Sequence, residues 1–268
     1  MATVQVNSWT EFLEAIAVSG DTVECPENAV WDMAQLEPEG HSGYIVCNAK
    51  INGRGTQIKN LVMLDSPANA RFFFNDDVTD LHILNATLEC SSSFFGVANF
   101  KTAQMCTFSG MLRGSGVGFG TNAYFYRCAA NLEWATATGT SIFGRNCSVK
   151  YCNFKVSGTR LQTIALYQHN SSDQISGYEN CYVILDTPQV TSLTGRKFKT
   201  SVLRCNAANV TDLSALNDGG GAQNFSLLVS SDFPNVQTTS SGVVLVTENN
   251  LRDAAYLQSI GFPIGVDG

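Results

Sequence analysis

The stretch Phe95-Gly96-Val97-Ala98-Asn99 begins a pattern that recurs as Phe119-Gly120-Thr121-Asn122, Phe143-Gly144-Arg145-Asn146 and Tyr167-Gln168-His169-Asn170. An aromatic residue precedes an asparagine by three or four positions each time, and the asparagines at 99, 122, 146 and 170 are 23, 24 and 24 residues apart. The same spacing extends back to Asn75 and Asn52. A fixed period of this size is typical of a chain built from stacked copies of one small unit.

Cysteines follow a similar period, at positions 106, 128, 152, 181 and 205, and Asn85 and Asn60 continue that series toward the N-terminus. The intervening residues are rich in Val, Ile, Phe, Tyr and Thr, broken by Gly, Asn and Ser, which indicates short strands and turns. Helical-hairpin repeats and propeller blades need longer units, whereas one coil of a parallel β-helix fits. We therefore expect like residues to stack on one another about 4.8 Å apart, with each buried Asn bonded to the next.

The N-terminal region predicts a helical cap. Ser8-Trp9-Thr10-Glu11 is a capping box, and apolar residues at 9, 12, 13 and 16 indicate an amphipathic helix that Gly20 ends. A strand over 21–25 and the segment Ile51-Asn52-Gly53-Arg54-Gly55-Thr56 follow. This opening resembles right-handed parallel β-helix proteins of the pectate-lyase-like superfamily. The resemblance implies a short helix that plugs the open end of the solenoid.

We expect one all-β domain, a right-handed single-stranded parallel β-helix. Residues 1–43 form a strand-helix cap, residues 44–235 form the coils, and residues 236–268 form a C-terminal strand and a short helix over 250–260. This last segment either seals the far end or attaches the chain to a partner. The residues that we expect in such an attachment surface are Leu251, Tyr256, Leu257, Phe262 and Ile264.

Composition limits the partners. Only 15% of residues are charged, the net charge is −7 and the pI is about 4.9, so we expect no nucleic-acid partner. No apolar run is long enough to span a membrane. The N-terminus lacks the pattern of a signal peptide, so we expect synthesis in a cytosol and reduced thiols for the nine cysteines, packed as small core residues. No metal-binding or cofactor motif is present, and we expect no cofactor.

Catalytic patterns are weak. The strongest acidic cluster is Asp76-Asp77 with Asp80, and the positions expected one coil away, Gly53-Arg54 and Phe100-Lys101, carry no carboxylate. We interpret the cluster as a bend. The Asn-Thr-Asp, Gly-His-Gly and Arg-Ile-Lys motifs of the polygalacturonases in the superfamily are absent. The glycines at 110, 114, 116, 118 and 120 match no phosphate-binding motif, and we expect turns with positive φ there.

Glycan binding requires exposed aromatic rings beside polar groups, and the residues that we expect to contact a glycan are Tyr126, Trp134, Tyr167 and His169. Our hypothesis is a non-enzymatic bacteriophage virion protein (a fibre, spike or decoration protein) that contacts other virion proteins, itself as a homotrimer, and a host-surface glycan. The alternative is a polysaccharide lyase or glycoside hydrolase that acts as a depolymerase. Three or more carboxylates converging in a surface groove would favour the alternative.

Overall fold

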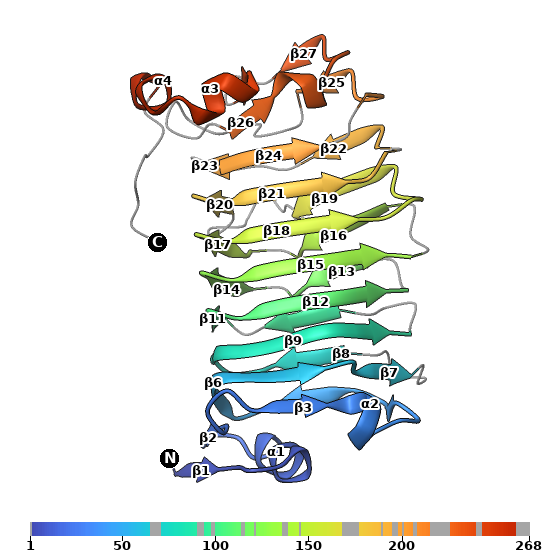
Figure 1. Ribbon diagram of the computed structural model, residues 1–268, viewed down its shortest axis with the longest axis vertical. Coiled ribbons are helices and arrows are strands. Elements are labelled where there is room, and N and C mark those ends of the chain that lie inside the picture. The colour runs from blue at the N-terminus through green and yellow to red at the C-terminus, as the bar shows by residue number, and fades with distance from the viewer. Residues whose placement is uncertain are drawn as a thin grey trace.

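The structure is a computed structural model that describes residues 2–64, 71–89, 94–97, 100–113, 116–120, 122–135, 139–144, 146–167, 177–188, 190–194, 198–199, 201–205, 208–214, 226–239 and 243–260. The chain forms a parallel β-solenoid of about 6 turns, which confirms the predicted class. It climbs from the N-terminal end to the C-terminal end with successive strands directly above one another (Figure 1).

Each coil has up to three sides. Side one contains β1 (Thr3–Gln5), β2 (Thr22–Glu24), β11 (Lys101–Gln104), β14 (Ala123–Tyr126), β17 (Ser148–Lys150), β20 (Gly177–Glu179) and β23 (Phe198–Lys199). Side two contains β3 (Val30–Asp32), β12 (Thr107–Leu112), β15 (Ala129–Trp134), β18 (Asn153–Ser157), β21 (Tyr182–Asp186), β24 (Ser201–Cys205), β26 (Ser226–Val229) and β28 (Val243–Val246). The long strands β6 (Lys50–Lys59) and β9 (Val78–Leu88) run from side one into side two.

Side three contains β5 (Ile45–Cys47), β8 (Arg71–Phe74), β10 (Phe94–Val97), β13 (Gly116–Phe119), β16 (Gly139–Phe143), β19 (Thr163–Tyr167) and β22 (Ser192–Thr194). Short strands β4 (His41–Ser42), β7 (Val62–Leu64), β25 (Asp212–Leu213) and β27 (Thr238–Thr239) extend the outer parts of some coils. Every strand pairing in the described residues is parallel, for example Asn131 with Lys155 between β15 and β18.

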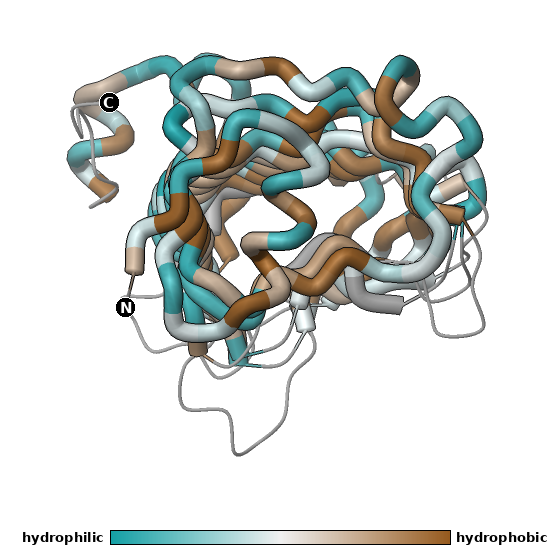
Figure 2. The backbone as a smooth tube through the Cα atoms, turned by 90° about the horizontal axis from the view of Figure 1, so that it is seen from below, coloured by the Kyte–Doolittle hydropathy of each residue, from teal (hydrophilic) through white to brown (hydrophobic). Residues whose placement is uncertain are grey.

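Alternation along the strands fills the interior with apolar side chains. In β15, Ala130, Leu132 and Trp134 are buried, while Asn131 and Glu133 are exposed. Aromatic rings stack between coils, with the ring centroids of Phe119 and Phe143 4.9 Å apart. Seen along the tube, hydrophobic and hydrophilic segments alternate around the stacked coils (Figure 2). The core is therefore one continuous column, as the period predicts.

The corner between sides three and one is an asparagine ladder; we call it the Asn corner. Asn146 Nδ2 donates to Asn122 Oδ1 at 3.2 Å, and Asn75 Nδ2 donates to Asn48 Oδ1 at 2.8 Å. The strand register places Phe100 between these two pairs, because Lys101 lies opposite Ala123. The column therefore contains Asn48, Asn75, Phe100, Asn122 and Asn146.

The observed ladder differs from the predicted one at two positions. Asn52 lies opposite Thr79 within β6 and β9, so Asn48 takes the place predicted for it. Asn99 and Asn170 lie outside the described residues, and the register gives the rung predicted for Asn99 to Phe100. Coils differ in length, so counting a constant period shifts the expected rung by one to four positions.

The corner between sides one and two is lined with thiols; we call it the thiol corner. Cys106, Cys128, Cys152 and Cys181 occupy one column, and Ser201 continues it because Tyr182 lies opposite Val202. The backbone N–H of Cys128 donates to Cys152 Sγ at 3.3 Å, and that of Cys181 donates to Ser201 Oγ at 3.2 Å. Cys152 Sγ and Ser201 Oγ thus each satisfy a buried backbone donor of the preceding coil.

All eight cysteines in the described residues are free and buried. The predicted column is wrong at both ends. Cys205 lies opposite Leu185, four residues beyond the thiol column. Asn85 lies in a β-bulge and donates through Nδ2 to Asn60 Oδ1 at 2.7 Å, which makes a separate short asparagine pair on side two.

The predicted acidic bend is part of a cross-coil contact. Asp76 Oδ1 accepts from Lys101 Nζ at 2.8 Å, and Asp77 Oδ1 accepts from the backbone N–H of Thr102. The register places Ala49 and Lys50, not Gly53 and Arg54, on the coil before, since Ile51 lies opposite Val78. The cluster therefore bonds to the next coil, with lysines on both sides of it.

The glycine run is also different from the prediction. Gly116 and Gly118 lie within β13 rather than in a turn, and Gly114 is outside the described residues. Among the described members only Gly110 has positive φ, at 153°, inside β12. A Cβ on Gly110 would lie 2.0 Å from the carbonyl oxygen of Ala86, so close packing of adjacent coils requires glycine there.

Both ends carry helices (Figure 1). Helix α1 (Trp9–Ile16) buries Trp9, Phe12 and Ile16 against the first coil, as predicted, and Ser8 Oγ accepts from the N–H of Glu11. A short helix α2 (Met33–Leu36) and a 3₁₀ turn η1 (Ser230–Asp232) lie in the connections. The predicted helix over 250–260 is two helices, α3 (Glu248–Arg252) and α4 (Ala254–Ser259), because Asp253 has an extended backbone and caps the second one.

Candidate functional site

The outer surface of side two forms a continuous face across the middle coils. One column of outward residues contains Ser109, Asn131, Lys155, Ile184 and Arg204, paired rung by rung. The next column contains Thr87, Met111, Glu133, Ser157 and Asp186. Alternation keeps these side chains outside because their neighbours fill the core. Apart from Met111 and Ile184, these residues form a polar strip parallel to the solenoid axis, and two hollows lie along it.

The first hollow, of about 360 Å³, lies over β9, β12, β15 and β18. Its polar lining consists of Asn85, Thr87, Ser109, Asn131, Glu133, Lys155 and Ser157. A β-bulge shapes its floor, where Asn85 adopts φ 54° and its N–H donates to Ser109 Oγ at 2.9 Å. Bulges of this kind re-aim side chains and are frequent beside functional sites.

The second hollow, of about 400 Å³, lies over β21 and β24. Arg204 forms its wall, with Nε 2.7 Å from Asp232 Oδ2 and Nη2 2.7 Å from Glu248 Oε1. The hydrogen bonds that Arg204 donates to Asp232 raise the pKa of Arg204 above its usual value, so this guanidinium is a fixed positive charge. Lys155 Nζ lies 3.3 Å from Asp186 Oδ2, and this ion pair joins the two hollows.

This face offers amides, hydroxyls and single charges to a ligand. Within the described ranges no ion pair engages Glu133, which leaves its carboxylate open toward the first hollow. No group of three His, Cys, Asp or Glu side chains in the described part of the chain is arranged to hold a metal ion. The arrangement suits hydrogen bonding to many hydroxyl groups, which is the chemistry of a sugar polymer.

The structure places the four predicted glycan contacts in different environments. Trp134 is 1% exposed and faces the core, so burial excludes it as a contact. Alternation shows why, because exposed Glu133 forces its neighbour inward. Tyr167 ends β19, but its side chain is outside the described part, as is all of His169. Tyr126 is half-buried on the outer surface of β14, and its role as a contact stays a prediction.

The C-terminal residues cover the last coil. Leu251, Tyr256 and Leu257 are partly buried against Val202 and Val246. These three side chains thus take part in sealing the end of the solenoid, and attachment of a partner through them stays a prediction. Phe262 and Ile264 lie outside the described residues.

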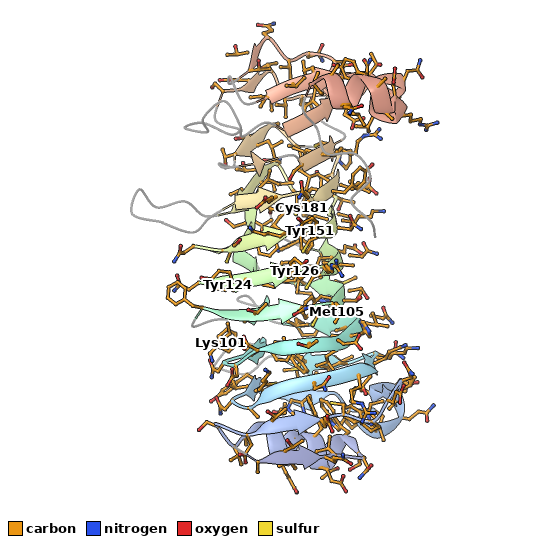
Figure 3. All side chains as sticks on the ribbon, turned by 90° about the vertical axis from the view of Figure 1, so that its left-hand side faces the viewer. Lys101, Met105, Tyr124, Tyr126, Tyr151 and Cys181 are labelled. Atoms are coloured by element: carbon orange, nitrogen blue, oxygen red, sulfur yellow. The ribbon has the colours of Figure 1, made fainter. Side chains whose placement is uncertain are left out.

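Sequence reasoning missed a second exposed surface, on the outside of the thiol corner. Met105, Arg127 and Tyr151 lie in one column, each immediately before a ladder cysteine, and all three have φ between 52° and 56°. Met105 is 40% exposed and Tyr151 is 38% exposed. Figure 3 shows Met105, Tyr126 and Tyr151 following one another up the stack. The signal was present in the sequence as the residue preceding each periodic cysteine.

Comparisons with known proteins add no relative. No family model, curated protein or solved structure matches the chain. No helix among the described residues has the length and hydropathy that a membrane span requires.

Proposed function

We propose that this chain is a non-enzymatic bacteriophage virion protein that binds a host-surface glycan along the outer face of side two. The observation that carries the proposal is the pair of hollows on one face, joined by the ion pair of Lys155 and Asp186. The first hollow offers hydroxyl, amide and charged groups, and the second offers hydroxyl and charged groups, in rows parallel to the solenoid axis. A linear polymer that lies along this axis would meet a new row of donors and acceptors at each coil, about every 4.8 Å.

The setting in a phage particle is supported by the thiols. Every described cysteine is a buried free thiol, which fits folding in a reducing cytosol before release of the particle. Stacked coils also form a stiff rod without need of disulfides. Assembly as a homotrimer, and contacts with other virion proteins, belong to the same proposal.

A polysaccharide depolymerase is the second candidate, and one observation favours it. Glu133 and Asp186 occupy one outward column two rungs apart, with Ser157 between them. Two rungs correspond to about 9.6 Å between the backbones, and inverting glycosidases hold their carboxyl groups roughly 6.5–9.5 Å apart. Against this role, Asp186 is 58% exposed and is paired with Lys155 rather than directed toward Glu133.

Incubation of the full chain with bacterial surface polysaccharides tests both candidates. We expect saturable binding without new reducing ends or unsaturated products. The variant Asn131→Trp, which fills the first hollow from its exposed edge, is expected to abolish binding, while Gln162→Trp, an exposed position outside the hollows, is expected to leave it unchanged. Products that disappear in Glu133→Gln would establish the depolymerase, and equal binding by both Trp variants would overturn the site.

A further inference from the structure

The outside of the thiol corner carries an aromatic and cationic ridge, which we define as Met105, Tyr126, Arg127 and Tyr151. The rings of Tyr126 and Tyr151 lie 5.5 Å apart at an interplanar angle of 79°, and the guanidinium carbon of Arg127 lies 5.4 Å from the Tyr126 ring centroid. Packing on the ring holds the guanidinium in place before any ligand arrives. The ridge therefore presents a preorganised cation over the Tyr126 ring, beside the ring of Tyr151.

Arg127 differs from the other cations nearby. Lys101 pairs with Asp76 at 2.8 Å, and Lys150 pairs with Glu179 at 2.8 Å. Within the part of the chain that the structure describes, no carboxylate pairs with Arg127, which is exposed. An exposed Arg without an internal anion has its planar fork of donors free for a carboxylate from outside.

Backbone conformation gives an independent reason to assign a role to the ridge. Asp80 and Asn180 occupy the same left-handed column at φ 52° and 54°, and residues of these two types tolerate that conformation well. Met, Arg and Tyr do not, yet they fill the three rungs between. Unfavourable backbone conformations that persist in bulky residues are concentrated at functional sites.

Charge along the sequence points to the kind of ligand. Residues 1–49 contain eight Asp or Glu and no Lys or Arg, whereas residues 101–204 contain eleven Lys or Arg and four Asp or Glu. The coils that carry the ridge are thus strongly cationic within a chain of net charge −7. A field of this sign attracts anions to the middle of the solenoid and away from its N-terminal end.

We infer that the ridge binds the carboxylate groups of an acidic polysaccharide, with Arg127 as the anion contact and Tyr151 as a sugar contact. The inference rests on the proposed glycan-binding function and deepens it, because it specifies an anionic rather than a neutral polymer. A protein partner fits less well, because the ridge is at most two side chains wide at each rung, whereas stable protein interfaces bury about 800 Å² on each partner.

Calorimetric titration of the full chain with alginate, a polyuronate, tests the inference against the same alginate with its carboxylates reduced to alcohols. We expect alginate to bind at least about tenfold more tightly, the factor expected from one charge-assisted hydrogen bond. Arg127→Asn is expected to remove that difference, and Arg127→Lys to keep part of it. Arg160→Asn, which removes an equal charge from an exposed turn after β18, is the matched control.

The variant Arg127→Asn also separates binding from folding. Asn favours the left-handed conformation, so the unfolding temperature of the variant is expected to equal or exceed that of the parent chain. Its affinity for alginate is expected to fall. Equal losses in the Arg127 and Arg160 variants would show only diffuse electrostatics and would overturn the inference. If both alginates bind equally well and Asn131→Trp still abolishes binding, this inference is wrong but the proposed function stands. If neither the alginates nor the surface polysaccharides bind, both proposals are wrong.

Discussion

The two corners of the coil use different residues to turn the chain from one side to the next. Across the middle coils, from Phe100 to Tyr151, each corner turns the chain through one left-handed residue and stacks that residue on its equivalent in the next coil. At the Asn corner, Asn122 and Asn146 fill the slot and bond to each other. At the thiol corner, Met105, Arg127 and Tyr151 fill it and point outward, and the cysteine that follows each one makes the contacts inside.

The difference separates stability from exposure. Asparagine tolerates left-handed backbone and satisfies its own amide in the ladder, so the Asn corner is self-sufficient. At the thiol corner the internal hydrogen bonds are made by the cysteine sulfur. The residue type at the left-handed position before each cysteine can therefore vary. Three bulky side chains there cost about 1 kcal/mol each in backbone strain. The thiol corner is therefore where this solenoid can present side chains to a ligand at regular intervals.

The largest expected effect comes from removing a thiol. Cys152→Ala deletes the acceptor of the Cys128 N–H and leaves that buried donor unsatisfied, which costs about 2 kcal/mol. Cys152→Ser restores an acceptor, as Ser201 provides one for Cys181, and is expected to lose less than half as much. Urea unfolding of the three chains gives the comparison. Equal destabilisation by Ala and Ser would show that sulfur acts only by filling space.

The fold was predictable because residues of the same type recur at a nearly fixed spacing, and apolar and polar residues alternate along the strands. The asparagine and cysteine spacings predict two stacked columns of like residues. The exact rungs were not predictable, because connections between sides differ in length from coil to coil. Phe100, Ser201 and Asn48 occupy ladder positions that a constant step assigns to Asn99, Cys205 and Asn52.

The candidate site was less accessible from sequence. The prediction of an exposed Trp134 is wrong, because Glu133 is exposed and strand alternation turns the next side chain into the core. The first hollow depends on a bulge at Asn85 and on the register of four strands, and neither property can be read from a single segment. Arg127 and Tyr151 are far apart in sequence and become neighbours only when the coils stack in the correct register. The sequence alone therefore does not predict that they form one surface.

Completing the Asn corner is expected to have an intermediate effect. Phe100 is 52% exposed at φ 59° and interrupts the ladder between Asn75 and Asn122. Phe100→Asn would relieve the left-handed strain and supply an amide to both neighbours, so we expect a gain of about 1 kcal/mol in unfolding free energy. Phe100→Gly relieves the strain without the amide and is the matched control. A gain no larger than that of the Gly variant would mean that the ladder bonds add nothing.

The smallest expected effect concerns the ion pair beside that interruption. Burial acts to raise the pKa of Asp76, but the hydrogen bonds from Lys101 and from the N–H of Asp77, with the charges of Lys101 and Lys50, lower it overall. A carboxyl whose folded pKa lies below its unfolded value stabilises the fold above the unfolded value, about 3.9. That contribution is lost as the pH falls through the folded pKa.

The same pair raises the pKa of Lys101, chiefly through its hydrogen bond to Asp76, so its stabilisation is also lost as the pH rises through that value. The Lys101 side chain is 37% exposed, and screening keeps the pair below about 1 kcal/mol. We expect Lys101→Met to lower the unfolding free energy at pH 7 and to converge with the parent chain near pH 2. A deficit that stays constant across this range would assign the effect to packing of the new methionine side chain. The ion pair itself would then contribute nothing to stability.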